Sequence, residues 1–169
     1  ARIYINGGKR GFLVGMAPSN SLIKRVFTMG SQFAYWRDYA KHKRFAMYLR
    51  WHIVMPTLTA IFGYFPGKRL GWLEDTPSGV VRDWISPEPR FEDIYKSGPQ
   101  ALSDEERSRL VEAFAQVTAP TLAVSMSDDE FGTIPAIHRL LSYFKNSAST
   151  HMRIEPDAVG QPSIGHFAF

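Results

Sequence analysis

Two residues near the end of the chain, Asp129 and His166, have the side chains and the positions that acid–base chemistry needs. Asp129 comes within three residues of a continuous apolar run at 121–126, and His166 follows a last short run across one loop. In an open parallel sheet, working side chains lie on loops just beyond the carboxyl ends of strands. A carboxylate there can fix the tautomer of an imidazole and favour the imidazolium formed during acyl transfer. Asp129 and His166 are therefore the candidate catalytic acid and base.

Each of the two residues also has a less specific interpretation. Asp129 could be a solvated loop carboxylate that caps the following helix, and the adjacent Asp128 competes with it for the role of acid. His166 could be a loop histidine close to a chain end. The other histidines have no metal-ligand spacing, so we expect surface or helix-face roles for His42, His52, His138 and His151.

The elements that must position the pair alternate between strands and helices. The chain opens as a strand (2–6), a glycine turn, a helix (10–16) closed by Pro18, and a second strand (25–30). Ser103 and Glu106 form a capping box for a later helix, and a further helix begins near Thr133, followed by a last strand at 151–155. This order predicts an α/β fold with about four parallel strands (2–6, 25–30, 121–126 and 151–155) flanked by helices.

The stretch 33–100 interrupts this alternation. It is rich in aromatic residues and cut by several prolines, and we expect one long helix over 38–62, bent near Pro56, and a short helix at 78–85. The sequence indicates an insertion over the core. Its aromatic part, 33–84, could be a lid over a pocket, ordinary core packing, or a contact between copies of the chain.

Composition limits the class of protein. The chain has 169 residues, of which 44% are hydrophobic and 21% charged, as expected for one domain with a real core. It has no cysteine, which excludes disulfides and thiolate metal sites and fits a cytoplasmic protein. The longest apolar run, 51–65, is too short to span a bilayer, and no secretory leader is visible. We expect a single domain over 1–169, incomplete because the chain is a fragment or a truncated product.

The net charge of +4 is modest, and the basic residues are scattered. The run 41–44 (KHKR) is typical of the solvated face of a helix, so we expect no nucleic-acid partner. We also expect no metal, no cofactor and no stable membrane insertion. A weak affinity for anionic surfaces is compatible with the charge alone. A peripheral membrane role for a helix over 41–62 is a further alternative, which the sequence disfavours because the Lys and Arg residues cluster at its start rather than along one face.

Several blocks of the sequence together resemble a known superfamily. The resemblance is to the C-terminal half of the α/β-hydrolases, closest to bacterial proteins described only as predicted α/β-hydrolases, and it covers about residues 11–169. The blocks that carry it are 35–38 (YWRD), 51–52 (WH) with 55–56 (MP), 62–71 (FGYFPGKRLG), 119–122 (APTL), 127–130 (SDDE) and 164–167 (IGHF).

The resemblance implies a serine-dependent hydrolase of esters, thioesters or amides with a small apolar substrate. These proteins carry the acid after the seventh strand of the fold and the histidine after the eighth, which favours Asp129 over Asp128 and gives His166 the role of general base. It also favours a lid as the function of the insertion 33–100. The substrate-binding residues would then include the lid aromatics Trp36, Trp51, Phe62 and Tyr64.

The chain departs from this family at the nucleophile. The expected strand, Gly-x-Ser-x-Gly turn and helix correspond to residues 5–12 (INGGKRGF), and the position of the serine falls on Gly8. Two hypotheses follow: a hydrolase-like chain whose nucleophile is missing, or a non-catalytic remnant that serves as an oligomerising or protein-interaction module. The second would use an uncovered sheet edge or the lid to form a homo-oligomer.

Overall fold

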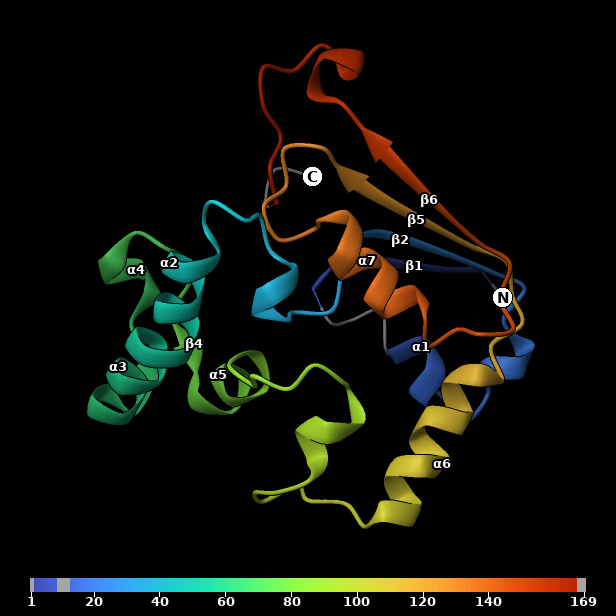
Figure 1. Ribbon diagram of the computed structural model, residues 1–169, viewed down its shortest axis with the longest axis horizontal. Coiled ribbons are helices and arrows are strands. Elements are labelled where there is room, and N and C mark those ends of the chain that lie inside the picture. Colours follow the sequence, from blue (N-terminus) through green and yellow to red (C-terminus); the bar gives the residue numbers. More distant parts are fainter. Residues whose placement is uncertain (1, 9–12, 167–169) are drawn as a thin grey trace.

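Four parallel strands form the main sheet of the protein. The computed structural model describes residues 2–8 and 13–166, with residues 2–8 and Asp83 described by their backbone only. The strands are β1 (Arg2–Gly8), β2 (Arg25–Ser31), β5 (Thr121–Met126) and β6 (Ser149–Ile154), in the spatial order β1-β2-β5-β6 (Figure 1). The predicted α/β fold, with about four parallel strands flanked by helices, is confirmed.

The burial of each strand explains its sequence pattern. β5 lies between β2 and β6, and five of its six residues are buried, because helices cover a parallel sheet on its faces. β6 pairs with β5, and its residues are exposed or half-buried. It begins at Ser149, two residues before the predicted strand, because Ser149 and Thr150 are polar and the apolar pattern misses them.

Three helices complete the core beside the sheet. They are α1 (Leu13–Met16), α6 (Asp104–Ala115) and α7 (Ile134–Leu141), and the core around Phe114 includes Val14, Val26 and Leu140. The predicted capping box is present at the start of α6: the Glu106 amide donates to Ser103 Oγ at 3.2 Å, and the Ser103 amide to Glu106 Oε2 at 2.8 Å. The predicted start of the first helix, 10–12, lies outside the described residues.

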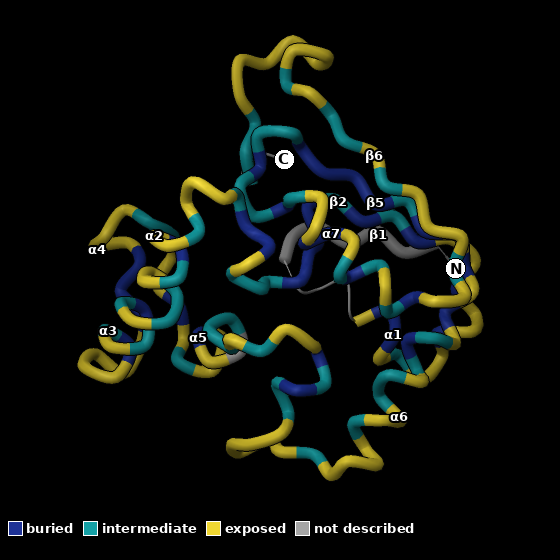
Figure 2. The backbone as a smooth tube through the Cα atoms, viewed as in Figure 1, coloured by how far each residue is buried: buried dark blue, intermediate teal, exposed yellow. Residues whose placement is uncertain are grey.

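The segment 33–100 has a small core of its own. Met55, Phe65 and Val81 are buried together, with Trp51 and Trp72 among the half-buried residues packed on them. Figures 1 and 2 show α2, α3 and α4 grouped at one side of the molecule, away from the sheet, with exposed outer surfaces. The elements are a 3-10 turn (Trp36–Asp38), α2 (Arg44–Leu49), a π turn (Arg50–Val54), α3 (Met55–Phe62), β3 (Tyr64–Phe65), α4 (Gly67–Leu70), β4 (Thr76–Pro77), α5 (Ser78–Trp84) and a 3-10 turn (Glu92–Tyr95).

The predicted helix over 38–62 is wrong at its start. The helix begins at Arg44, because contacts with the sheet loops use the backbone before it: Thr133 Oγ1 donates to the Asp38 carbonyl, and the Ala40 amide donates to the Glu130 carbonyl at 3.3 Å. The irregular part of the run is the π turn at Arg50–Val54, which ends two residues before Pro56. Proline has no N–H for the bond to the residue four positions earlier, so an irregular turn just before Pro56 fits its chemistry. The predicted short helix at 78–85 is confirmed as α5.

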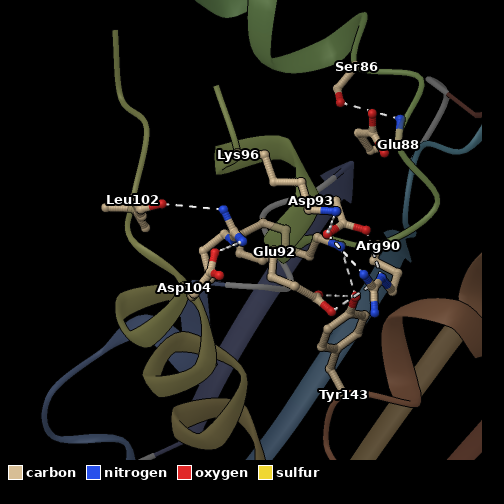
Figure 3. Close-up of polar contacts among 11 residues, drawn as sticks. Ser86, Glu88, Arg90, Glu92, Asp93, Lys96, Leu102, Asp104 and Tyr143 are labelled. Carbon is tan, nitrogen blue, oxygen red and sulfur yellow. Dashed lines mark hydrogen bonds and ion pairs between the residues drawn. The ribbon is translucent and has the colours of Figure 1, made fainter. Parts of the chain in front are cut away.

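Helix α7 and the turn after it hold both ends of the segment 33–100. Near the start of the segment, Arg139 of α7 pairs with the buried carboxylate of Asp38, to whose Oδ1 it donates at 3.0 Å. Near the end, Arg139 donates to the Pro89 carbonyl at 3.1 Å, and the hydroxyl of Tyr143, in the turn after α7, accepts from the Phe91 amide and donates to Glu92 Oε2, both at 2.8 Å (Figure 3). The two ends of the segment are therefore fastened close to each other on the core.

The same end of the segment carries a charged cluster that stiffens the turn (Figure 3). The buried Asp93 carboxylate accepts from Arg90 at 2.7 and 3.1 Å and pairs with Lys96 at 2.9 Å. The Arg90 hydrogen bond, followed by that of Lys96, holds the pKa of Asp93 below its usual range.

No helix among the described residues is both long enough and apolar enough to cross a bilayer.

We expect Gly15→Ala to destabilise the chain by about 1–3 kcal/mol, the usual cost of overpacking a core. A Cβ at Gly15 would lie 1.7 Å from Phe114 Cδ1, and Phe114 is fully buried. Urea unfolding followed by circular dichroism measures the loss. Gly79→Ala is the matched control, because a Cβ there meets nothing within 4 Å and α5 gains a better helix former. Equal stability of the two variants would contradict this account of the core.

Candidate functional site

The loop after β5 holds Asp129 in a fixed orientation. Asp129 is 3% exposed, and its Oδ1 accepts hydrogen bonds from the amides of Phe131 and Gly132, both at 2.8 Å. Its Oδ2 contacts His166 Nδ1 at 2.7 Å, and the His166 side chain is 11% exposed. The two residues that the sequence singled out therefore lie together at the carboxyl edge of the sheet.

Gly132 is needed at its position because of this carboxylate. A Cβ there would lie 2.3 Å from Asp129 Oδ2, the oxygen that contacts the imidazole. Any larger residue would have to displace either the carboxylate or the backbone that donates to it. The loop is thus shaped around Asp129 on both sides, by two amides and by the absence of a side chain.

Asp128, the competing acid, has a different task. Its Oδ2 accepts from Ser163 Oγ at 2.9 Å, the Ile164 amide at 2.8 Å and the Gly165 amide at 3.0 Å. These bonds, that of the Ile164 amide above all, keep the pKa of Asp128 below its usual range. Asp128 thus binds the backbone just ahead of His166, whereas Asp129 binds the imidazole itself.

Strand β6 braces the same loop from the other side. Arg153 donates to the Ser127 carbonyl at 2.9 Å and to the Gly132 carbonyl at 3.4 Å, which ties together the two ends of the loop. The Ser127 amide donates to the Ile154 carbonyl at 3.0 Å, and Ser127 Oγ donates to Glu155. The loop is therefore rigid before any ligand reaches it.

Phe131 connects the site to the segment 33–100. Its ring centroid lies 5.0 Å from that of His166, 5.4 Å from that of Tyr39 and 6.2 Å from that of Trp51. Burial raises the pKa of the Tyr39 phenol, with smaller contributions from Asp38 and Asp129, so this ring stays neutral beside the carboxylate. Sequence reasoning missed Phe131, although its position two residues after the acid was a usable signal.

The predicted substrate-binding aromatics differ in their surroundings. Trp51 packs near Phe131 and Trp84, and its Nε1 is buried with no hydrogen-bond partner among the described residues. Trp36 packs on Tyr48 at 4.9 Å. Phe62 and Tyr64, near the end of α3, are 46% and 39% exposed, and the described contacts do not join either of them to Asp129 or His166. A role in substrate binding stays a prediction for all four.

The end of β2 carries two polar residues that sequence reasoning did not select. Gly8, the predicted serine position, ends β1 and pairs with Ser31. Ser31 Oγ and Gln32 Oε1 are buried, and neither atom has a hydrogen-bond partner among the described residues. The residues after Gly8, 9–12, lie outside the described residues, so the predicted turn stays a prediction. Polar residues that end an apolar strand were the available signal.

A second serine–histidine contact lies away from the pair. Ser125 Oγ contacts His151 Nε2 at 2.8 Å, and the rings of His151 and His138 lie 5.3 Å apart. Ser125 is fully buried inside β5, where it cannot meet a substrate. Burial, and then the neighbouring His138, lower the pKa of His151. No cluster suited to a metal ion occurs in the described part of the chain.

The strand order and the pair define the class of domain. A parallel sheet with an acid beyond β5 and a histidine beyond the neighbouring β6 is the C-terminal architecture of an α/β-hydrolase-type fold. One architecture of this kind can carry many different activities, so the activity depends on the residues of the site.

Comparison with known proteins finds only weak structural similarity. No family model and no curated protein matches the chain. Among solved structures, the chain is similar to the protein Rv0554 from Mycobacterium tuberculosis (18% identity, TM-score 0.43, covering 100% of this chain and 59% of that one). It is also similar to a monoacylglycerol lipase from Paleococcus ferrophilus (14% identity, TM-score 0.41, covering 91% of this chain and 58% of that one). A third similar structure is a meta-cleavage product hydrolase from Pseudomonas fluorescens (16% identity, TM-score 0.36, covering 98% of this chain and 58% of that one). The chain thus spans less than two thirds of their length, and these scores are too low to assign an activity.

We expect Asp128→Asn to release the loop that carries His166, because an amide replaces an acceptor of three hydrogen bonds. The measurement is the NMR signal of the His166 Nδ1 proton, which should broaden or vanish, together with faster amide exchange at Ile164 and Gly165. Asp157→Asn is the matched control, since Asp157 is exposed in the nearby 3-10 turn Pro156–Val159. An unchanged His166 signal in Asp128→Asn would contradict the role of Asp128.

The same bonds set a pH dependence for the unmodified chain. Because the pKa of Asp128 is lowered in the folded state, its contribution is complete above the ordinary value for aspartic acid, about 3.9. It is lost as the pH falls through the lowered value. The protection of the Ile164 and Gly165 amides, measured as the exchange rate relative to that of an unstructured peptide at the same pH, should therefore stay high at neutral pH and fall only in acid below that range.

Proposed function

We propose that this chain carries the acid–base half of a serine-type hydrolase of esters, thioesters or amides. His166 is the general base and Asp129 its orienting partner. The observation that carries the proposal is the 2.7 Å contact between His166 Nδ1 and Asp129 Oδ2 at the edge of the sheet. With Nδ1 directed to the carboxylate, the other ring nitrogen, Nε2, is the atom that takes a proton from a nucleophile.

The electrostatics of the pair support this direction of proton transfer. The Asp129 side chain is buried, and three donors contact its carboxylate: the amides of Phe131 and Gly132 and the imidazole itself. A carboxylate fixed in this way stabilises the imidazolium that appears when His166 accepts a proton, and it needs no reorganisation to do so. Lone loop histidines lack this arrangement.

The substrate class follows from the rings beside His166. Phe131 and Trp51 offer an apolar wall, which suits a small apolar acyl group, and the buried Trp51 Nε1 is a donor for a polar atom of that substrate. In this proposal the segment 33–100 is a lid, and Trp36, Phe62 and Tyr64 belong to its substrate-facing or entry surface. No metal or cofactor takes part.

A second candidate function is a non-catalytic interaction module, and Gly8 favours it. Glycine has no nucleophile, and Gly8 stands where the resemblance expects the serine. In this case the site keeps its shape but performs no hydrolysis, and the chain acts through a contact with a second copy or another protein. Sedimentation tests this alternative, because a monomer at all concentrations counts against self-association.

We expect Gly8→Ser to create a nucleophile that reacts with a fluorophosphonate probe, whereas the unmodified chain stays unlabelled. The label should depend on the pair: adding His166→Ala to Gly8→Ser should slow labelling about 100-fold or more, the usual worth of a general base. Adding Asp129→Asn should also slow it. Mass spectrometry of the labelled protein gives both the rate and the modified residue.

Three results would count against the proposal. Labelling of the unmodified chain, for example at Ser31, would show a nucleophile other than the one proposed. A folded Gly8→Ser variant that is never labelled would favour the non-catalytic module. Labelling of Gly8→Ser that is indifferent to His166→Ala would remove His166 from the chemistry. Replacing His42 by alanine in Gly8→Ser is the matched control, because His42 is an exposed histidine before α2.

A further inference from the structure

The helical run 44–62 has two apolar faces, and only one of them packs on the protein. Met47, Trp51, Met55 and Thr59 follow each other at intervals of four and are buried or half-buried. A second series, also at intervals of four, is exposed: Phe45 (74%), Leu49 (40%), Ile53 (51%) and Ile61 (67%). We call this second series the outer stripe. A surface helix needs one apolar face for its core, so the outer stripe is unexplained by folding.

The π turn keeps the outer stripe continuous. Intervals of four residues overshoot an α-helical turn of about 3.6 residues, so such a stripe drifts around a plain α-helix. The π turn Arg50–Val54 has wider i→i+5 spacing and partly cancels the drift between Leu49 and Ile53. Thr57 occupies the remaining position of the series, and its hydroxyl donates to the Ile53 carbonyl at 2.7 Å. Because this hydroxyl is already hydrogen-bonded within the helix, covering the outer stripe would leave it with a partner.

The segment that carries the outer stripe is rich in cations. Residues 39–73 contain six Lys and Arg residues and no Asp or Glu, although the whole chain has a net charge of only +4. Two of the six are paired, Lys43 with Glu130 and Lys68 with Glu74. The other four, which have no acidic partner among the described residues, are Lys41, Arg44, Arg50 and Arg69.

We propose that the outer stripe and its cations bind the surface of an anionic lipid bilayer. Exposed apolar residues along one line of a helix, in a segment with four cations that have no acidic partner among the described residues, are what an interfacial helix needs to lie in the headgroup region. A second copy of the chain is disfavoured as the occupant, because facing stripes would bring like charges together. The binding is peripheral, since the described helices are too short to span a bilayer. This inference does not depend on the proposed hydrolysis.

The first test uses vesicles and the apolar residues. The full chain should co-sediment with vesicles of phosphatidylglycerol and phosphatidylcholine at least tenfold more strongly than with phosphatidylcholine alone, and salt should weaken this binding. The double variant Phe45→Ser with Ile53→Ser should lose at least tenfold in binding. Its control is Leu22→Ser with Val159→Ser, which removes two exposed apolar residues elsewhere, 66% and 52% exposed.

The second test separates the charges from the apolar residues. Lys41→Glu with Arg69→Glu should reduce binding to the anionic vesicles, whereas Lys24→Glu with Lys145→Glu, an equal charge change on exposed residues outside 39–73, should have a much smaller effect. All substituted residues are on the surface, and thermal unfolding of each variant checks that the fold is kept.

Each other outcome overturns the proposal. Equal binding to both kinds of vesicle would show that the cations do not contribute to binding. No binding to either kind would show that the outer stripe does not bind a lipid surface. A concentration-dependent dimer that Phe45→Ser with Ile53→Ser dissociates, without vesicle binding, would make a second copy the occupant instead. Loss of vesicle binding in the control Leu22→Ser with Val159→Ser would show that another face of the protein contacts the lipid.

Discussion

Two neighbouring carboxylates, Asp128 and Asp129, bind the short segment 164–166, and the geometry of the site depends on the different groups that they bind. Asp128 holds the backbone of Ile164 and Gly165, and Asp129 holds the imidazole of His166. An imidazole on a loose loop would spend much of its time away from its partner. Because Asp128 holds the backbone in place, the contact between the Asp129 and His166 side chains costs little further conformational entropy.

The sheet and the segment 33–100 meet at the same loop. Phe131 lies between His166 and the aromatic rings of the segment. Arg139 of the following helix, α7, and Tyr143 just after it fasten both ends of that segment. The polar contacts are few but lie at the two points where the segment leaves and rejoins the core. The arrangement of the site and that of the segment are therefore linked through about a dozen residues after β5.

The strands and the pair were predictable, whereas the fastening contacts were not. The buried run 121–126 can form only an interior strand, so the residues after it had to lie at the edge of the sheet, where Asp129 and His166 meet. The role of Asp128 depends on amides 36 and 37 residues away, which no local pattern reveals. The start of α2 was missed for the same reason: distant partners use the backbone of Asp38 and Ala40.

The π turn at Arg50–Val54 is equivalent to one extra residue accommodated within a helix. Deleting one residue there would turn the run into a plain α-helix with little change in the orientation of the parts before and after it, because the turn already absorbs that residue. Met55 would stay against Phe65 and Val81. A deletion elsewhere in the run would instead rotate one part by about 100° relative to the other, so the π turn is the place where this helix can lose a residue and keep its buried face.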